Sequence, residues 1–189
     1  MPFSARLRVL AMLCLSALLL VAPKNTPEVT LNKDSMSLPV VHVPALLTPE
    51  QLRLVSHLHQ VWQVPRELAH RIVTATYKEA HSIGSTPTLL LAMMAKESSF
   101  NPTVSSSYGA VGLMQVVPRF HPEQLSTGES LENPETNIRV GAEVFREYLD
   151  ANDGALEPTM KMYSGRAAQY FKRVKAYQQE FERARISAS

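Results

Sequence analysis

The stretch of sequence that decides the fold is residues 87–118, PTLLLAMMAKESSFNPTVSSSYGAVGLMQVVP. Pro87 suits the first position of a helix. The residues from Leu89 to Ala95 are apolar, so they would cover every side of that helix. A helix that is apolar all round is normally buried. The sequence therefore predicts a buried helix over residues 87–97.

Glu97 comes at the end of this helix, shortly before Asn101 and Pro102 break the pattern. A carboxyl in such a place loses hydration and meets the negative end of the helix dipole, and both effects raise its pKa. Its neighbour Lys96 should point elsewhere, because adjacent helical residues do not face each other. A carboxyl that stays protonated near neutral pH is suited to general acid catalysis. The pattern alone leaves two interpretations open: Glu97 is a general acid, or it is an ordinary exposed residue at a helix end.

A glycine-containing segment follows at residues 108–115, YGAVGLMQ. Gly109 and Gly112 allow a positive φ angle or the close approach of another chain, such as a sugar. The amide of Gln115 offers both a donor and an acceptor, which suits a sugar hydroxyl or acetamide. The segment therefore predicts a turn that brings Gln115 to a binding site.

Helical patterns lie on both sides of this stretch. Thr48, Pro49 and Gln51 have the spacing of a capped helix start, and apolar residues follow at helical intervals. No segment alternates apolar and polar residues over any length, so we expect a mainly α fold. The other expected helices cover residues 65–82, 134–151, 154–163 and 167–186.

The first residues have the pattern of an export signal. Arg6 and Arg8 precede a 14-residue apolar run that ends at Ala22. As a helix this run would rise about 21 Å, short of the ~30 Å hydrocarbon core of a bilayer. Residues 1–22 are therefore predicted to be a signal peptide, with an uncleaved membrane anchor as the alternative.

The rest of the chain is expected to consist of a linker and one domain, with the boundary at the helix start around Thr48 and Pro49. Residues 23–48 contain four prolines among scattered polar residues, which predicts an extended linker. Residues 49–189 would then form a single helical domain, a size that one core can fill.

Composition excludes several classes of function. Residues 23–189 carry 17 basic and 17 acidic side chains, so no charge excess favours a nucleic-acid partner. Cys14 is the only cysteine of the chain. His57 and His59 are two residues apart and would lie on different sides of a helix. We therefore expect no metal site and no cofactor.

Four blocks of the sequence resemble one known family. Residues 97–102 (ESSFNP) and 109–115 (GAVGLMQ) resemble the two signature blocks of the lytic transglycosylases with a goose-type-lysozyme-like SLT domain. Residues 133–141 (NPETNIRVG) and 162–165 (MYSG) resemble two further blocks in the same order. The resemblance extends over about residues 65–177, and it implies a lysozyme-like helical domain.

The resemblance also implies an activity. Members of the family cleave the β-1,4 bond between N-acetylmuramic acid and N-acetylglucosamine in peptidoglycan. They add no water: the C6 hydroxyl of the muramic acid attacks C1 and leaves a 1,6-anhydro end. By this resemblance Glu97 would act first as general acid and then as base. The substrate-binding residues would be Ser98, Met114, Gln115 and Tyr163, the last with its hydroxyl near Glu97. For Met114 and Tyr163 a position in the core stays open as the alternative.

The sequence departs from the family pattern at two single positions and at residues 166–168, where Arg-Ala-Ala replaces the usual Pro-Gly. Val117 stands before Pro118 where a second Met is usual, and Ser164 stands where Asn is usual. These departures concern contacts to the sugar and leave the acid in place.

Two other functions stay open. A hydrolysing lysozyme on the same fold would need a second carboxylate, for which a distant acid such as Glu135 would have to fold back. An inactive glycan-binding scaffold protein would retain the cleft without the chemistry. For the leading interpretation the partner is the glycan strand of peptidoglycan. A secretion system or another envelope-spanning assembly stays open as a further partner. The expected location is the periplasm, with a tether to the inner membrane if residues 1–22 are not cleaved.

Overall fold

The computed structural model describes residues 46–187, which form six α-helices and two short 3-10 turns. The predicted signal or anchor segment at 1–22 lies outside the described residues, as does the predicted linker up to residue 45. The elements are α1 (Pro49–Gln60), α2 (Arg66–Ser82), α3 (Pro87–Ser98), η1 (Pro118–Phe120), η2 (Pro122–Gln124), α4 (Pro134–Ala151), α5 (Leu156–Tyr163) and α6 (Tyr170–Ile186).

The fold of this part is mainly α, as predicted. Between residues 46 and 187 the only β pairing consists of two isolated bridges, Ser105 with Val111 and Val111 with Val116. Thr48 caps α1 as expected: its hydroxyl accepts a bond from the Gln51 amide, and the Gln51 side chain accepts one from the Thr48 amide. No helix in the described part has both the length and the apolar character needed to cross a membrane.

Two helices begin two or three residues later than the sequence predicts. α5 begins at Leu156 because Gly154, with φ +78°, closes the end of α4 through a bond from its amide to the carbonyl of Leu149. α6 begins at Tyr170 because Gln169 has φ +65°, which no right-handed helix accommodates. Both differences arise from left-handed residues that hydrophobic periodicity does not reveal.

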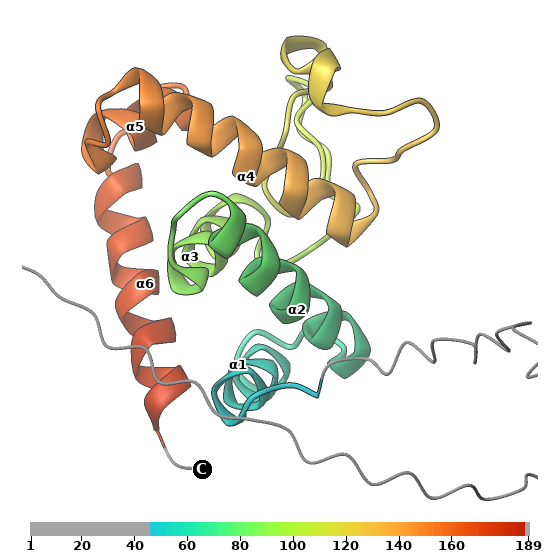
Figure 1. Ribbon diagram of the computed structural model, residues 1–189, viewed down its shortest axis with the longest axis vertical. Coiled ribbons are helices and arrows are strands. Elements are labelled where there is room, and N and C mark those ends of the chain that lie inside the picture. Colours follow the sequence, from blue (N-terminus) through green and yellow to red (C-terminus); the bar gives the residue numbers. More distant parts are fainter. Residues whose placement is uncertain (1–45, 188–189) are drawn as a thin grey trace, which may run out of the picture. The chain divides into compact units, whose positions relative to one another are not determined.

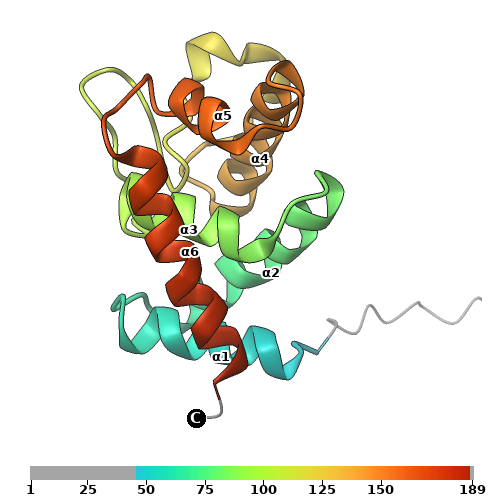
Figure 2. The same ribbon diagram turned by 90° about the vertical axis from the view of Figure 1, so that its left-hand side faces the viewer.

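α3 lies in the middle of the described part (Figures 1 and 2), where it packs against α6 and against α2. α1 contacts α2 and α6 on one side of α3, and α4 and α5 pack together on the opposite side. The long connection between α3 and α4 passes beside α4 on the side away from α1. α3 is therefore enclosed by helices and by this connection.

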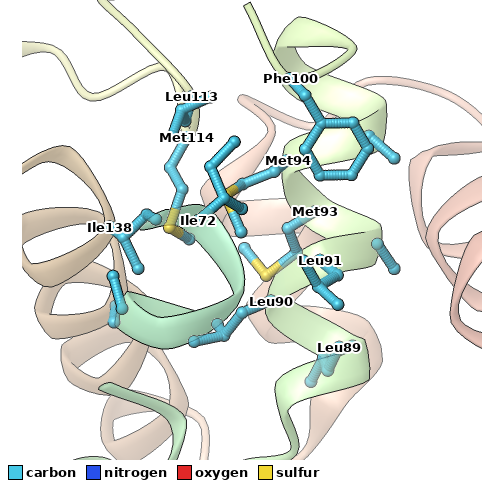
Figure 3. Packing of buried hydrophobic residues seen from close by; sticks show 14 of the residues in the cluster. Ile72, Leu89, Leu90, Leu91, Met93, Met94, Phe100, Leu113, Met114 and Ile138 are labelled. Atoms are coloured by element: carbon cyan, nitrogen blue, oxygen red, sulfur yellow. The ribbon is translucent and has the colours of Figure 1, made fainter. Parts of the chain in front are cut away.

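Burial of α3 is complete along eight consecutive residues, from Thr88 to Ala95. Figure 3 shows its side chains gathered with Ile72 of α2, Ile138 of α4 and Met114 of the α3–α4 connection. An all-apolar helix surface can be covered only in this way, so the prediction of a buried helix over 87–97 is confirmed. The core thereby fixes the position of the last turn of α3, where Glu97 lies.

Candidate functional site

The end of α3 is held by a sharp reversal of the chain. Ser99 and Phe100 both have positive φ angles, +50° and +64°. The side chain of Phe100 is buried, with its ring centroid 5.2 Å from that of Trp62 and 6.0 Å from that of Phe181. Two consecutive left-handed residues are costly, and they persist where the surrounding packing enforces them. The packing of Phe100 against Trp62 and Phe181 thereby fixes Glu97 in the last turn of α3, just before the reversal.

Glu97 receives a hydrogen bond from a tyrosine of another helix. The hydroxyl of Tyr170, the first residue of α6, donates to Oε1 of Glu97 at 2.5 Å. Burial raises the pKa of the Glu97 carboxyl, whereas the bond from Tyr170 and the charge of Lys96 act in the opposite direction. The net direction is upward, as the sequence predicts.

Lys96 does not point away from this group, contrary to our expectation. Its Nζ atom lies 5.7 Å from the centroid of the Tyr170 ring, which carries the hydroxyl bound to Glu97. Adjacent helical residues differ in the direction of their first side-chain bonds, but the long lysine side chain can bend, so that its Nζ atom comes to lie near Tyr170. Its charge therefore moderates the rise of the Glu97 pKa.

The tyrosine expected beside Glu97 makes a different bond. The hydroxyl of Tyr163 donates to the carbonyl oxygen of Met114 at 2.9 Å. Burial, and next the nearby Glu97, raise the pKa of Tyr163 well above its ordinary value, so it stays a neutral donor. Tyr163 thus lies near Glu97, while the hydroxyl that is bonded to the carboxyl is that of Tyr170.

Sequence reasoning missed Tyr170, although a signal for it exists. Tyr170, Val174 and Phe181 are the buried residues of α6, and they recur at helical spacing. This spacing places Tyr170 on the face of α6 that packs against α3. A tyrosine at the end of an otherwise apolar stripe brings a hydroxyl into a buried region, where it needs a partner.

A cleft of about 440 Å³ opens beside Glu97. Within the part of the chain that the structure describes, Glu97 is the one carboxylate lining this cleft. Glu135 instead pairs with Arg71 of α2 at 2.6 Å and does not line the cleft. The other lining residues are Ser106, Tyr108, Ala110, Gln115, Val116, Val117, Phe120, His121, Val144, Tyr148, Met162, Tyr163, Ser164 and Gly165.

Gln115 lines the cleft with its amide oxygen available. Its φ angle is +51°, and its Nε2 donates to the carbonyls of Val104 and Gly112 at 3.1 and 3.0 Å. No described donor is bonded to its Oε1 atom, which does not lie sealed in the interior. Gln115 can therefore accept one hydrogen bond from a ligand, while its donors hold the turn.

Two residues expected to bind substrate have internal roles instead. Met114 is fully buried, and its side chain packs against Gly141 of α4, so it cannot reach a ligand in the cleft. The hydroxyl of Ser98 bonds to the carbonyls of Met94 and Leu113, at 3.1 and 2.8 Å, and Ser98 does not line the cleft. Ser98 thus ties the end of α3 to the glycine-containing turn.

The glycine-containing turn is pinned to α4 by one buried asparagine. Asn137 donates to the carbonyls of Val111 and Leu131 at 2.9 and 2.8 Å, and it accepts a bond from the Met114 amide at 2.7 Å. Gly112 has φ +75°, and a Cβ atom there would lie 2.3 Å from Nδ2 of Asn137. The close approach that this glycine permits is therefore to Asn137 and not to a sugar.

The described residues 46–187 contain no cluster of metal ligands. No three His, Cys, Asp or Glu side chains in this range lie together in a way that could hold a metal ion. The residues that bear on chemistry are Glu97 and Gln115, which line the cleft, and Tyr170, which donates to Glu97.

The substitution Tyr170→Phe should raise the pKa of Glu97. The lost hydroxyl stabilises the carboxylate form, and its removal also leaves the group in more apolar surroundings. Titration of the Glu97 carboxyl carbon by NMR measures the shift. Tyr163→Phe is the matched control, because it removes a hydroxyl that bonds to a carbonyl and not to Glu97. An unchanged Glu97 pKa in Tyr170→Phe would show that the hydroxyl does not tune it.

Glu97→Gln should stabilise the folded chain at neutral pH and have little effect in acid. In the folded chain the pKa of Glu97 lies above its ordinary value of about 4.3. At pH values between the ordinary and the raised pKa, the folded chain therefore binds more protons than the unfolded chain. Stability contributed at this position therefore falls as pH rises through that window. Glutamine stays neutral and avoids the loss. Thermal unfolding of both chains over a pH series checks this, and equal melting temperatures at every pH would contradict it.

Comparison with known proteins relates this geometry to one family. The model of the family described as "Transglycosylase SLT domain" matches residues 75–185, more than half of the chain. The chain is 31% identical over 143 residues to the "Membrane-bound lytic murein transglycosylase C" of Pectobacterium atrosepticum, covering 63% of this chain and 38% of that protein. Proteins of the same name from Actinobacillus pleuropneumoniae serotype 5b and Yersinia enterocolitica serotype O:8 are 34% and 38% identical, over 51% and 38% of this chain.

The matched region covers only part of each relative: 29% of the Actinobacillus protein and 22% of the Yersinia protein. The family model itself spans α3, the cleft-lining segments, α4, α5 and nearly all of α6, and it leaves out α1. The resemblance seen in the sequence motifs is thereby confirmed. The chain belongs to the transglycosylase SLT domain family.

Proposed function

We propose that this chain is a peptidoglycan lytic transglycosylase. Its substrate would be the glycan strand, and the bond cleaved would be the β-1,4 link between N-acetylmuramic acid and N-acetylglucosamine. The product would carry a 1,6-anhydro-muramic end. Family membership and the names of the relatives support this activity.

One observation carries the proposal: a single carboxyl lines the cleft among the described residues, and burial raises its pKa. A raised pKa favours the protonated form that a general acid needs. The bond from Tyr170 and the charge of Lys96 keep the carboxylate form accessible, which a base needs. Glu97 is therefore suited to transfer a proton in both directions.

In the first step the Glu97 carboxyl donates its proton to the glycosidic oxygen. The bond from C1 of the muramic acid to that oxygen breaks, and the N-acetylglucosamine leaves with a free hydroxyl. Glu97 is left as a carboxylate, which the Tyr170 hydroxyl stabilises through its hydrogen bond. Positive charge develops at C1 as the bond breaks.

In the second step the Glu97 carboxylate accepts the proton of the C6 hydroxyl, and that oxygen forms a bond to C1. The ring closes as the 1,6-anhydro product, and Glu97 regains its proton. The nucleophile belongs to the same sugar, so no water has to be positioned and little entropy is lost. The one available carboxyl serves for the whole cycle.

The two alternatives receive less support from the cleft. Hydrolysis by two carboxylates needs a pair about 5–9.5 Å apart across the bond. Glu135, the acid considered for the second place, is held by Arg71 away from the cleft. An inactive scaffold has no need of a buried carboxyl bonded to a tyrosine, because such a group lowers stability without serving binding.

The place of action that we propose is the periplasm, where peptidoglycan lies. The relatives carry the description "membrane-bound", which is compatible with an envelope location. The basic and apolar pattern of residues 1–22 would supply either the export signal or the anchor.

The proposal is tested by incubating the full chain with purified peptidoglycan and analysing the soluble products by mass spectrometry. We expect muropeptides with anhydro ends. Reducing ends would instead support the lysozyme. Glycan binding without any released product, at several pH values and enzyme concentrations, would support the scaffold and contradict the proposal.

A further inference from the structure

Trp62 lies in the short connection between α1 and α2, outside the residues that the family model matches. This connection is held by hydrogen bonds of its own. The Val64 amide donates to the carbonyl of Leu58 at 3.1 Å, and Nδ1 of His59 lies 2.9 Å from the carbonyl oxygen of Val64. Trp62 itself is partly buried against the core. The fold therefore gives this side chain a fixed position.

The indole ring of Trp62 packs against the end of α3 and against α6 at the same time. Its centroid lies 5.2 Å from that of Phe100, just after α3, and 5.3 Å from that of Tyr177 on α6. It also stacks on Phe181 of α6, with the centroids 6.1 Å apart. Aromatic pairs at such distances attract each other beyond the area that they bury. Trp62 therefore joins α3 to α6.

A hydrogen bond fixes the orientation of the indole ring. Nε1 of Trp62 donates to Oε1 of Glu180 at 2.9 Å, and the same oxygen lies 2.7 Å from Nε2 of His57. An indole N–H that is partly buried needs such an acceptor. Because Glu180 belongs to α6, the bond holds the ring to that helix in one orientation.

The contact with Phe100 acts on the position of Glu97. Phe100 follows Glu97 by three residues, and it has a φ angle of +64° after a φ angle of +50° at Ser99. A bulky residue stays in this left-handed region only where the packing enforces it. Without the indole ring against it, Phe100 would relax, and the last turn of α3 would move with it.

The contact with Tyr177 acts on the partner of Glu97. Tyr170 and Tyr177 are seven residues apart on α6, so they share one face of the helix about 10 Å apart. A displacement of α6 at Tyr177 is therefore carried to Tyr170. The bond from the Tyr170 hydroxyl to Oε1 of Glu97 is short, at 2.5 Å, so it depends closely on the spacing of the two helices.

We propose that Trp62 is a positioning residue for the proposed reaction: it sets the spacing of α3 and α6 at which Tyr170 bonds to Glu97. The inference rests on the proposed function for the role of Glu97. The family model begins at residue 75, so the match includes both members of the bond but not the residue that spaces them. The alternative is that Trp62 only fills the core, in which case its loss would lower stability and leave Glu97 unaffected.

The direct test is a double-substitution cycle on the pKa of Glu97, read by NMR of its carboxyl carbon in the full chain. Trp62→Leu keeps an apolar side chain, shortens it and removes the donor to Glu180. It should raise the pKa of Glu97, as we expect for Tyr170→Phe, because the carboxylate form loses its donor. In the Tyr170→Phe background, Trp62→Leu should change this pKa no further, since the bond through which it acts is already absent.

Activity gives a second readout. Trp62→Leu should lower kcat for soluble glycan strands about tenfold, as for the loss of one good hydrogen bond, and leave KM unchanged. The reason is that the bond from Tyr170 stabilises the carboxylate formed as the glycosidic bond breaks and takes no part in holding the strand. The alkaline limb of the pH profile of kcat/KM should move to higher pH, because this limb reports the pKa of the acid.

Three further variants separate positioning from folding. Val55→Ala leaves a cavity at a buried residue of α1, so it should lower the melting temperature without moving kcat or the pKa of Glu97. Glu180→Gln keeps an acceptor for the indole N–H and should behave like the unaltered chain. Glu180→Met removes the acceptor and should change the pKa and kcat in the same direction as Trp62→Leu.

An unchanged pKa of Glu97 in Trp62→Leu overturns the inference. So does an equal upward shift with and without the Tyr170 hydroxyl, or an equal shift in Val55→Ala. If Trp62→Leu does not fold, the difference between Glu180→Met and Glu180→Gln decides by the same readout. Failure of the proposed function looks different: the unaltered chain would release no product, while the titration cycle, which needs no turnover, would still decide whether Trp62 sets the bond.

Discussion

Replacing Glu97 by Gln should reduce the rate of peptidoglycan cleavage at least about 10³-fold, because a proton transfer by a positioned group contributes about 10²–10⁴-fold and Glu97 would perform two of them. The amide has nearly the same shape, and its oxygen can still accept the Tyr170 hydroxyl. Binding to glycan strands should therefore persist. The measurement is the initial rate of soluble product release, with strand binding measured alongside.

Glu157→Gln is the matched control for this experiment. Glu157 is an exposed glutamate in the first turn of α5, paired with Lys161 and outside the cleft. Its replacement should leave the rate unchanged, since exposed ion pairs contribute little. If Glu97→Gln retained a tenth or more of the rate, Glu97 would not be the acid, and another group would have to be sought.

Gly112→Ala should cause the largest loss of stability, about 3–5 kcal/mol in the free energy of unfolding. The new methyl group would lie 2.3 Å from Nδ2 of Asn137 and 2.5 Å from the carbonyl oxygen of Leu131. Relief of that overlap would break the buried hydrogen bonds of Asn137, at about 1–3 kcal/mol for each group left unpaired. Denaturant unfolding monitored by circular dichroism measures the change.

Gly128→Ala isolates the contribution of the backbone. Gly128 also has a positive φ angle, +88°, but a Cβ atom there would meet nothing within 4 Å. Gly128→Ala should therefore lower the free energy of unfolding by only about 1–2 kcal/mol, which is the cost of alanine in a left-handed conformation. Equal losses in the two variants would show that Asn137 can move aside, and that the turn is not pinned as described.

Much of the fold can be predicted from sequence because its signals are local. The run from Leu89 to Ala95 leaves no polar face, so its burial is required by composition alone. Thr48 caps α1 through contacts with a residue three positions along the chain, which spacing reveals directly. The starts of α5 and α6 are harder to predict, because a left-handed residue such as Gln169 leaves no mark in the hydrophobic periodicity.

The candidate site could be predicted in part. Glu97 follows from the end of a buried helix, and its raised pKa follows from burial. Tyr170 is hard to single out from sequence, because its contact with Glu97 spans 73 residues and Tyr163, Tyr170 and Tyr177 all lie in the last part of the chain. Met114 and Ser98 look like ligand contacts in the motif, whereas tertiary packing turns one inward and bonds the other to backbone carbonyls.

The central claim, that one carboxyl cleaves the strand without adding water, is tested most directly by digestion in ¹⁸O-labelled water. The account predicts anhydro ends that contain no ¹⁸O, formed by the full chain and absent with Glu97→Gln. Reducing ends that carry one ¹⁸O atom would mean that water attacks C1, and the account of the cleft would then be wrong.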